Sequence, residues 1–199
     1  MDTELAAFLD ELLEQGREHD AGKADRLERL RNVEAETAQL LAVLVRALAP
    51  AKLLELGTSN GYSTIWLADA ARAAGGHVTS VEVEAERTAQ AQANLDRAGL
   101  SDLVELRVED AADTLAGAAD ASWQLVFLDS ERPAYVAYWP ELVRTLADGG
   151  LLVVDNVLSH ADEVREFRAL VAADARFLEA LVPIGAGVLL IVKQRPEDA

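Results

Sequence analysis

Three side chains that could bind a metal ion follow two apolar segments of the chain. Asp129 follows the apolar residues 125–128, and Asp155 and Asn156 follow residues 151–154. If these segments are neighbouring parallel strands, the three side chains emerge at the same edge of a sheet. Two carboxylates and an amide oxygen suit a hard divalent cation such as Mg²⁺, which leaves positions open for substrate oxygens. The spacing is equally compatible with a structural role, in which Asp129 caps a helix and Asp155-Asn156 forms an Asx turn.

A second candidate site is the glycine-containing segment Glu55-Leu56-Gly57-Thr58-Ser59-Asn60-Gly61. It connects an apolar strand, residues 52–56, to a helix that starts near Tyr62, and such a turn places a ligand at the carboxyl edge of a sheet. Glycine lets the backbone approach that ligand closely. The segment lacks the third glycine of a dinucleotide motif and the Lys-Ser/Thr of a P-loop, so it is not built for a pyrophosphate or triphosphate. On its own it could equally be a structural turn.

Glu82 supplies a carboxylate about 20 residues beyond this segment, at the end of another apolar run. Rossmann-like folds hold ribose hydroxyls with a carboxylate in this position. Together the two features predict a ligand with a free ribose. S-adenosylmethionine (SAM) has a ribose and carries no phosphate, whereas a dinucleotide is the alternative that these features alone leave open.

The hydrophobic pattern predicts the elements that position these residues. Apolar residues recur with helical spacing over residues 5–13 and 27–48, and Pro50 ends the second helical stretch. Short apolar runs then alternate with amphipathic stretches, which predicts βαβ units. The expected strands are residues 52–56, 77–83, 103–108, 125–129 and 151–155. Because the last two are almost continuously apolar, we expect a parallel sheet with helices on both faces.

Two further strands are expected to complete the sheet. A helix over residues 161–173 precedes the apolar runs 177–182 and 188–192, which are separated by Pro183-Ile184-Gly185-Ala186-Gly187. So short a connection predicts an antiparallel hairpin. The expected fold class is therefore α/β and Rossmann-like, with a seven-stranded, mostly parallel sheet and an antiparallel C-terminal hairpin. One domain is expected over residues 1–199, with N-terminal helices in 1–49 and an α/β core in 50–194.

Composition narrows the classes of function. The chain has 199 residues, 51% of them hydrophobic, which is enough for the core of one domain. The absence of cysteine excludes disulfides, thiolate zinc sites and cysteine nucleophiles. The net charge of −17 repels the phosphates of nucleic acids. No basic leader opens the chain and no apolar run approaches the ~20 residues of a membrane span, so we expect a cytoplasmic protein.

Taken together, the motifs resemble the cation-dependent O-methyltransferase family that includes catechol O-methyltransferase and caffeoyl-CoA O-methyltransferase. The resemblance covers about residues 33–192. It rests on Leu54-Glu55-Leu56-Gly57 with Gly61-Tyr62-Ser63, on Phe127-Leu128-Asp129, and on Gly149-Gly150 followed by Asp155-Asn156-Val157. Residues 183–187 are similar to the family's terminal hairpin. A bacterial class I SAM methyltransferase is implied.

The resemblance also implies roles for individual residues. Contacts with SAM are implied for Val33, Glu55, Gly57, Ser63, Glu82, Val83, Asp110, Ala111 and Asp129. Metal ligation is implied for Asp129, Asp155 and Asn156. In the family, Mg²⁺ binds adjacent hydroxyls on an aromatic ring and lowers their pKa, so that an oxyanion can attack the methyl group in line.

Two positions depart from the family's pattern. Many bacterial members have Asp-x-Asp-Lys after the fourth strand, whereas this chain has Asp129-Ser130-Glu131-Arg132. Arginine cannot deprotonate in a protein, so Arg132 would stabilise a phenolate or bind an acidic substrate. General-base work would then fall to the metal, to solvent or to His160. For His160, the alternative is a polar residue at the start of a helix. The candidate catalytic residues are therefore Asp129, Arg132 and His160. Ala186 replaces a common aspartate, so the hairpin loop is expected to recognise a different group.

The leading prediction is a SAM-dependent, metal-assisted O-methyltransferase that acts on a small aromatic or vicinal-hydroxyl acceptor. One alternative is a tRNA wobble-uridine O-methyltransferase, a role of some bacterial relatives that the negative charge disfavours. Another is a non-catalytic SAM-binding or dinucleotide-binding module, prompted by the missing lysine. The expected partners are the small acceptor and a second copy in a homodimer, with no nucleic acid and no membrane.

Overall fold

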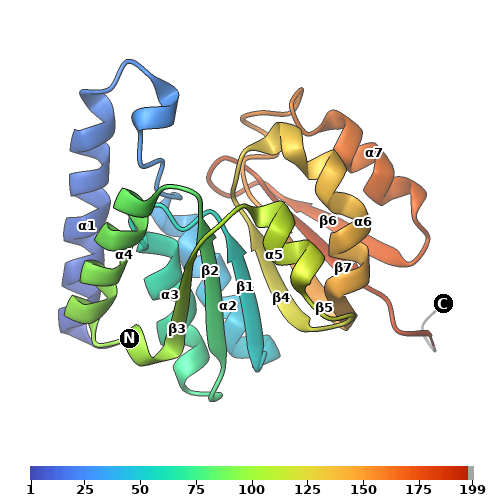
Figure 1. Cartoon of the computed structure of the whole chain (residues 1–199), viewed down its shortest axis with the longest axis horizontal. Helices are drawn as coiled ribbons and strands as arrows, with labels where there is room; N and C mark the ends of the chain where they lie inside the picture. The colour runs from blue at the N-terminus through green and yellow to red at the C-terminus, as the bar shows by residue number, and fades with distance from the viewer. Residues whose placement is uncertain (197–199) are drawn as a thin grey trace.

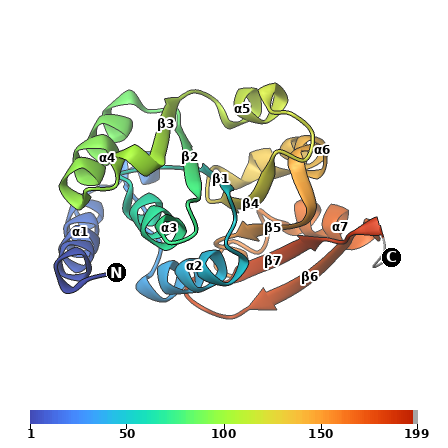
Figure 2. The same cartoon turned by 90° about the horizontal axis from the view of Figure 1, so that it is seen from below.

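The fold is built on one seven-stranded sheet, seen edge-on between two layers of helices in Figure 2. The structure, a computed structural model, describes residues 1–196, so residues 197–199 of the expected domain lie outside the described residues. Seven strands form: β1 (Lys52–Leu56), β2 (His77–Glu82), β3 (Val104–Val108), β4 (Trp123–Leu128), β5 (Leu146–Val154), β6 (Phe177–Val182) and β7 (Val188–Lys193).

The strand order is β3-β2-β1-β4-β5-β7-β6 (Figure 1). The first five strands in this order are parallel, and β7 pairs antiparallel with both β5 and β6. The predicted α/β fold with an antiparallel C-terminal hairpin is therefore confirmed. Strand order reverses between β1 and β4, which brings the loops that follow these two strands to one point on the carboxyl edge.

Helices cover both faces of the sheet, as the apolar strands predict. One face packs against α1 to α4 and the other against α5 to α7. The α-helices are α1 (Thr3–Ala21), α2 (Ala35–Leu48), α3 (Tyr62–Arg72), α4 (Ala85–Ala98), α5 (Ala111–Gly117), α6 (Tyr135–Thr145) and α7 (Arg165–Ala173). Three short 3₁₀ turns occur at η1 (Arg26–Glu28), η2 (Ser101–Leu103) and η3 (Arg132–Ala134). Within residues 1–196, no helix has the length and apolar composition needed to cross a bilayer.

The helical prediction over residues 27–48 is wrong in its first part, because α2 begins only at Ala35. Tertiary partners take the backbone groups that a helix would have used. The Asp20 carboxylate accepts hydrogen bonds from the N–H groups of Leu30 (2.6 Å) and Arg31 (2.8 Å). Arg31 also has a φ of 54°, which is incompatible with a right-handed helix.

The predicted helix over residues 161–173 also starts later, at Arg165. The chain after β5 first runs along the hairpin that connects β6 to β7. There the N–H groups of Leu158 and Ser159 donate to the carbonyl of Ala186, both at 3.0 Å. These bonds place the hairpin loop beside the turn that carries Asn156 and His160.

Candidate active site

The glycine-containing loop after β1 has the conformation that a strand-to-helix turn at this edge requires. Gly57 has a φ of 112° and Gly61 a φ of 85°, both in the left-handed region that glycine tolerates. A Cβ atom on Gly57 would overlap the carbonyl oxygen of Asp129. The loops after β1 and β4 are therefore in direct contact, and only glycine fits between them.

Glu55 lies behind this loop, fully buried. Its carboxylate accepts hydrogen bonds from the hydroxyls of Ser63 (2.6 Å), Ser80 (2.6 Å) and Thr64. Thr58 continues the network, 2.6 Å from the Ser80 hydroxyl. Burial raises the pKa of Glu55 to about 7, against the lowering effect of these hydrogen bonds. The carboxyl group thus joins β1, β2 and α3 beneath the loop.

Glu82 occupies the end of β2, where a ribose-binding carboxylate was predicted. It accepts hydrogen bonds from the N–H groups of Ser59 (2.9 Å), Val83 (3.0 Å) and Glu84 (3.1 Å). These contacts fix the carboxylate beside the loop. Asp110 caps the start of α5 through the N–H of Ala112 (2.7 Å) and, like Glu82, lines the cavity described below.

A cavity of about 690 Å³ lies at the carboxyl edge, within the size range of small-molecule sites. Every predicted site residue except Glu55 lines it. These are Val33, Gly57, Ser63, Glu82, Val83, Asp110, Ala111, Asp129, Arg132, Asp155, Asn156 and His160. The structure thus brings together the residues predicted to bind cofactor, metal and acceptor, while Glu55 is separated from the cavity by the loop it supports.

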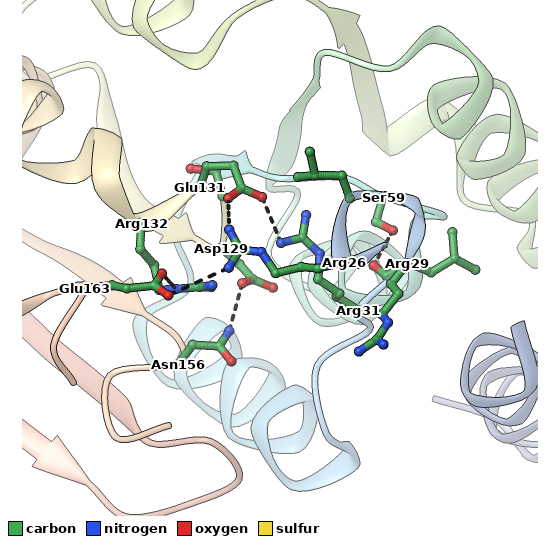
Figure 3. Close-up of polar contacts among 12 residues, drawn as sticks. Arg26, Arg29, Arg31, Ser59, Asp129, Glu131, Arg132, Asn156 and Glu163 are labelled. Carbon is green, nitrogen blue, oxygen red and sulfur yellow. Dashed lines mark hydrogen bonds and ion pairs between the residues drawn. The ribbon is translucent and has the colours of Figure 1, made fainter. Parts of the chain in front are cut away.

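Asp129, Asp155 and Asn156 meet at one end of this cavity. The Asn156 amide nitrogen donates to Asp129 Oδ1 and to Asp155 Oδ2, both at 3.1 Å, and the first of these bonds is drawn in Figure 3. Asn156 has a φ of 65°, a left-handed conformation that asparagine adopts more readily than most residues. Asp129 and Asp155 thus share one neutral donor.

The cluster has the donor set of a site for a hard cation. Among the described residues, Asp155 Oδ1 is buried without a hydrogen-bond partner, although such an oxygen normally has one. Burial is the main cause that raises the pKa of both Asp129 and Asp155, and their mutual repulsion adds to the increase for Asp155. The Asn156 amide can present its oxygen to the same point by turning over. The described residues gather no trio of His, Cys, Asp or Glu, so the third ligand would be this amide.

Arg132 stands on the cavity wall but is almost fully buried. Its Nε atom donates to Glu163 Oε2 at 2.8 Å. His160 lies nearby, and burial and the Arg132 guanidinium lower the pKa of its ring, which is therefore neutral near pH 7. Its Nδ1 atom lies 2.8 Å from the Ser159 hydroxyl.

Of the wall that residues 23–34 contribute to the cavity, only Val33 was predicted from the sequence. Arg26 and Arg31 from this segment both contact the carboxylate of Glu131 (Figure 3). Tyr138 of α6 also lines the cavity and was not among the predicted site residues, whereas Tyr135 on the same helix is in the core. Helical spacing cannot separate these two tyrosines, and no motif marked the arginines.

The sheet order and a cavity at the carboxyl edge define a class, the Rossmann-like fold of class I SAM methyltransferases. Solved structures of this class match the chain. The O-methyltransferase from Bacillus cereus, in complex with S-adenosylhomocysteine (SAH), has a TM-score of 0.80 and 25% identity, covering 94% of this chain and 91% of that one. TomG from Streptomyces achromogenes, in complex with SAM, has a TM-score of 0.79 and 27% identity, covering 98% and 91%.

The sequence itself gives the family. Residues 3–194 match the model of the O-methyltransferase family, and the chain belongs to this family, as its motifs predicted. Catechol O-methyltransferase of Mycobacterium tuberculosis is 40% identical over 128 residues, which cover 63% of this chain and 57% of that protein. The enzyme of the same name from Niastella koreensis is 38% identical over 60% of this chain and 54% of its own length. The chain therefore matches just over half the length of these relatives.

Proposed function

We propose that this chain transfers a methyl group from SAM to a hydroxyl group of a small acceptor. Family membership supports the reaction, and the SAM and SAH complexes of similar structures support the donor. The glycine loop and Glu82 form the half of the cavity that would hold the ribose and the methionine part of SAM. Asp110 and Ala111 would flank the adenine.

The class of acceptor is inferred from one observation: Asp129, Asp155 and Asn156 lie in contact at the other end of the cavity. We propose that these residues hold a divalent cation, and that the acceptor carries vicinal hydroxyls, as in a catechol. The cation would lower the pKa of a bound hydroxyl. The name of the M. tuberculosis relative agrees with such an acceptor.

The remaining residues would act around the acceptor. By holding the cation, Asp129 and Asp155 would fix the position of the hydroxyl pair, and the cationic Arg132 would stabilise the negative charge on the reacting oxygen. His160, neutral at neutral pH, would accept the proton, since arginine cannot. A methyl acceptor held in line with the sulfonium then needs no further covalent chemistry from the protein.

The test is a comparison of Asp155→Ala with Asp162→Ala, a control at an exposed acid that pairs with Arg165 outside the cavity. With catechol as the acceptor, we expect Asp155→Ala to lose most methyl transfer while its affinity for SAM stays within about twofold. Titration of the wild-type protein with Mg²⁺ should restore activity after chelation. A wild-type protein that fails to bind SAM would refute the proposal, and equal activity of the two variants would refute the assigned metal site.

Binding and activity measurements on the wild-type protein distinguish the alternatives. A tRNA substrate is disfavoured by the net charge of −17, and saturable binding of tRNA at low salt would support it instead. A non-catalytic SAM-binding module would bind SAM and transfer no methyl group to any catechol. A homodimer and a cytoplasmic location stay predictions, to be checked by light scattering and by cell fractionation.

A further inference from the structure

Residues 23–34, here called the strap, belong to the segment that connects α1 to α2 (Figure 1). The strap forms one wall of the cavity. Eight of its residues line the cavity: Arg26, Leu27, Arg29, Leu30, Arg31, Asn32, Val33 and Glu34. Val33 is the single buried residue of the strap. Apolar burial therefore contributes little to holding the strap in place, and polar contacts must do so.

On the cofactor side, the strap is attached to the glycine loop and to α4. The Ser59 hydroxyl donates to the carbonyl of Leu30 at 2.7 Å. Ser59 lies beside the strap in Figure 3. The guanidinium of Arg87 donates to the carbonyls of Leu27 and Arg29. The N–H of the same Ser59 donates to Glu82, so this side of the strap is joined to the proposed ribose site.

On the acceptor side, the shortest ion pairs of the strap all involve one carboxylate, that of Glu131. Glu131 Oε2 lies 2.7 Å from Arg26 Nη2, and Glu131 Oε1 lies 2.8 Å from Arg31 Nη1. The side chains of Glu131, Arg26 and Arg31 are 43%, 42% and 33% exposed, so water and salt reach both ion pairs. A longer contact of 3.8 Å joins Arg26 to Glu163, the partner of Arg132. Glu131 is two residues from Asp129, at the acceptor end of the cavity.

We propose that Glu131 is a positioning residue that clasps the strap over the acceptor end of the cavity, and that release of this clasp limits the exchange of bound ligand. The two sides of the strap differ in chemistry. On the cofactor side, Ser59, Arg87 and Asp20 bind its backbone groups, whereas on the acceptor side exposed ion pairs bind its side chains. The acceptor side is thus the one that opens at little free-energy cost. The identity of the ligand, SAH after the reaction, rests on the proposed function.

The experiment compares Glu131→Ala with the control Asp162→Ala, which also removes one acid from an exposed ion pair but has no contact with the strap. Limited trypsin digestion reports strap opening through cleavage after Lys23, Arg26, Arg29 or Arg31. Stopped-flow mixing reports the rate of SAH release. We expect both rates to rise about two- to fivefold in Glu131→Ala, which is the size of effect of exposed ion pairs, and neither to rise in the control.

Salt provides an independent measurement on the unaltered protein. At about 1 M NaCl the screening length falls to about 3 Å. The wild-type rates of strap cleavage and of SAH release should then approach those of Glu131→Ala, while the rates of the variant barely change. This arm remains informative if the variant folds poorly.

Three results would overturn the clasp: equal strap cleavage in Glu131→Ala and the control, faster cleavage without faster SAH release, or wild-type rates that do not respond to salt. Failure of the wild-type protein to bind SAH would refute the proposed function instead. Strap cleavage is measured without ligand, so it tests the attachment by Glu131 separately from the identity of the ligand.

Discussion

Glu55 illustrates how a residue can act on a site that it does not touch. Its family resemblance implies a contact with SAM, yet the side chain is fully buried behind the loop, and that contact stays a prediction. Ser63 and Thr58, which hydrogen-bond to its network, do line the cavity. The position of Glu55 therefore favours a role in shaping the loop.

The raised pKa of Glu55 predicts how stability varies with pH. The protonated carboxyl is favoured in the folded protein, so its stabilising effect is complete below about pH 4.5 and is lost as the pH rises to about 7. The glutamine side chain of the Glu55→Gln variant cannot ionise, so the variant does not lose this stability as the pH rises. We expect urea unfolding at pH 5, 6, 7 and 8 to show the variant gaining about 2.5 kcal/mol relative to wild type across this range. Parallel stability curves would show that the carboxyl titrates normally.

Gly57 supports a second prediction at the residue scale. An alanine Cβ at this position would overlap the carbonyl of Asp129, whereas a Cβ on Gly75, also at positive φ (69°), meets no atom within 4 Å. Gly75→Ala therefore measures the cost of the left-handed conformation alone, about 1–2 kcal/mol. Gly57→Ala should cost more and should also weaken SAM binding, because the loops after β1 and β4 must separate. Equal unfolding free energies for the two variants would contradict the close contact.

At the scale of elements, helix α6 holds the loop that carries Glu131 and Arg132. The hydroxyl of Tyr135, at the start of α6, donates to the carbonyl of Ser130 (3.0 Å) and accepts from its N–H (3.1 Å). Tyr135→Phe leaves these two backbone groups without that partner and should cost about 1–3 kcal/mol in urea unfolding. We also expect a higher KM for the acceptor with a nearly unchanged KM for SAM. Tyr138→Phe, on the same helix, is the matched control for stability.

The elements that the sequence predicted correctly are those with a strong local pattern. The strands β1 and β6 have the predicted bounds, and the parallel strands with their antiparallel C-terminal hairpin agree with the prediction from the apolar runs and the connections between them. Residues 27–34 of the strap were predicted as helix because their apolar residues have helical spacing. Instead, Asp20, at the end of α1, and Ser59 and Arg87, both distant in the sequence, bind the backbone of the strap. Periodicity carries no information about such partners. The same limitation hid the contacts of Glu131.

At the scale of the whole molecule, the sheet explains why the predicted site residues converge. They lie near or after the carboxyl ends of the strands β1 to β5, or in the segment before α2. The reversal of strand order between β1 and β4 brings the loops after these two strands together. The chain carries a net charge of −17, and five arginines line this cavity together with eight acidic residues. The cavity thus offers both acidic groups, which can hold a cation or ribose hydroxyls, and guanidinium groups such as that of Arg132, which can face a negatively charged oxygen.

The net charge also shapes the last prediction, which concerns divalent cations. Any salt screens the self-repulsion of so acidic a chain, so Mg²⁺ must be compared with NaCl at equal ionic strength. A cation bound by Asp129, Asp155 and Asn156 should raise Tm beyond this screening effect. Burial raises the pKa of both carboxyls, so protons compete with the cation at low pH. The difference between Tm in Mg²⁺ and Tm in NaCl should therefore grow as the pH rises from about 6 to 8. Thermal unfolding of wild type and Asp155→Asn checks this: the Tm difference should disappear in the variant, and a difference that persists there would place the cation elsewhere.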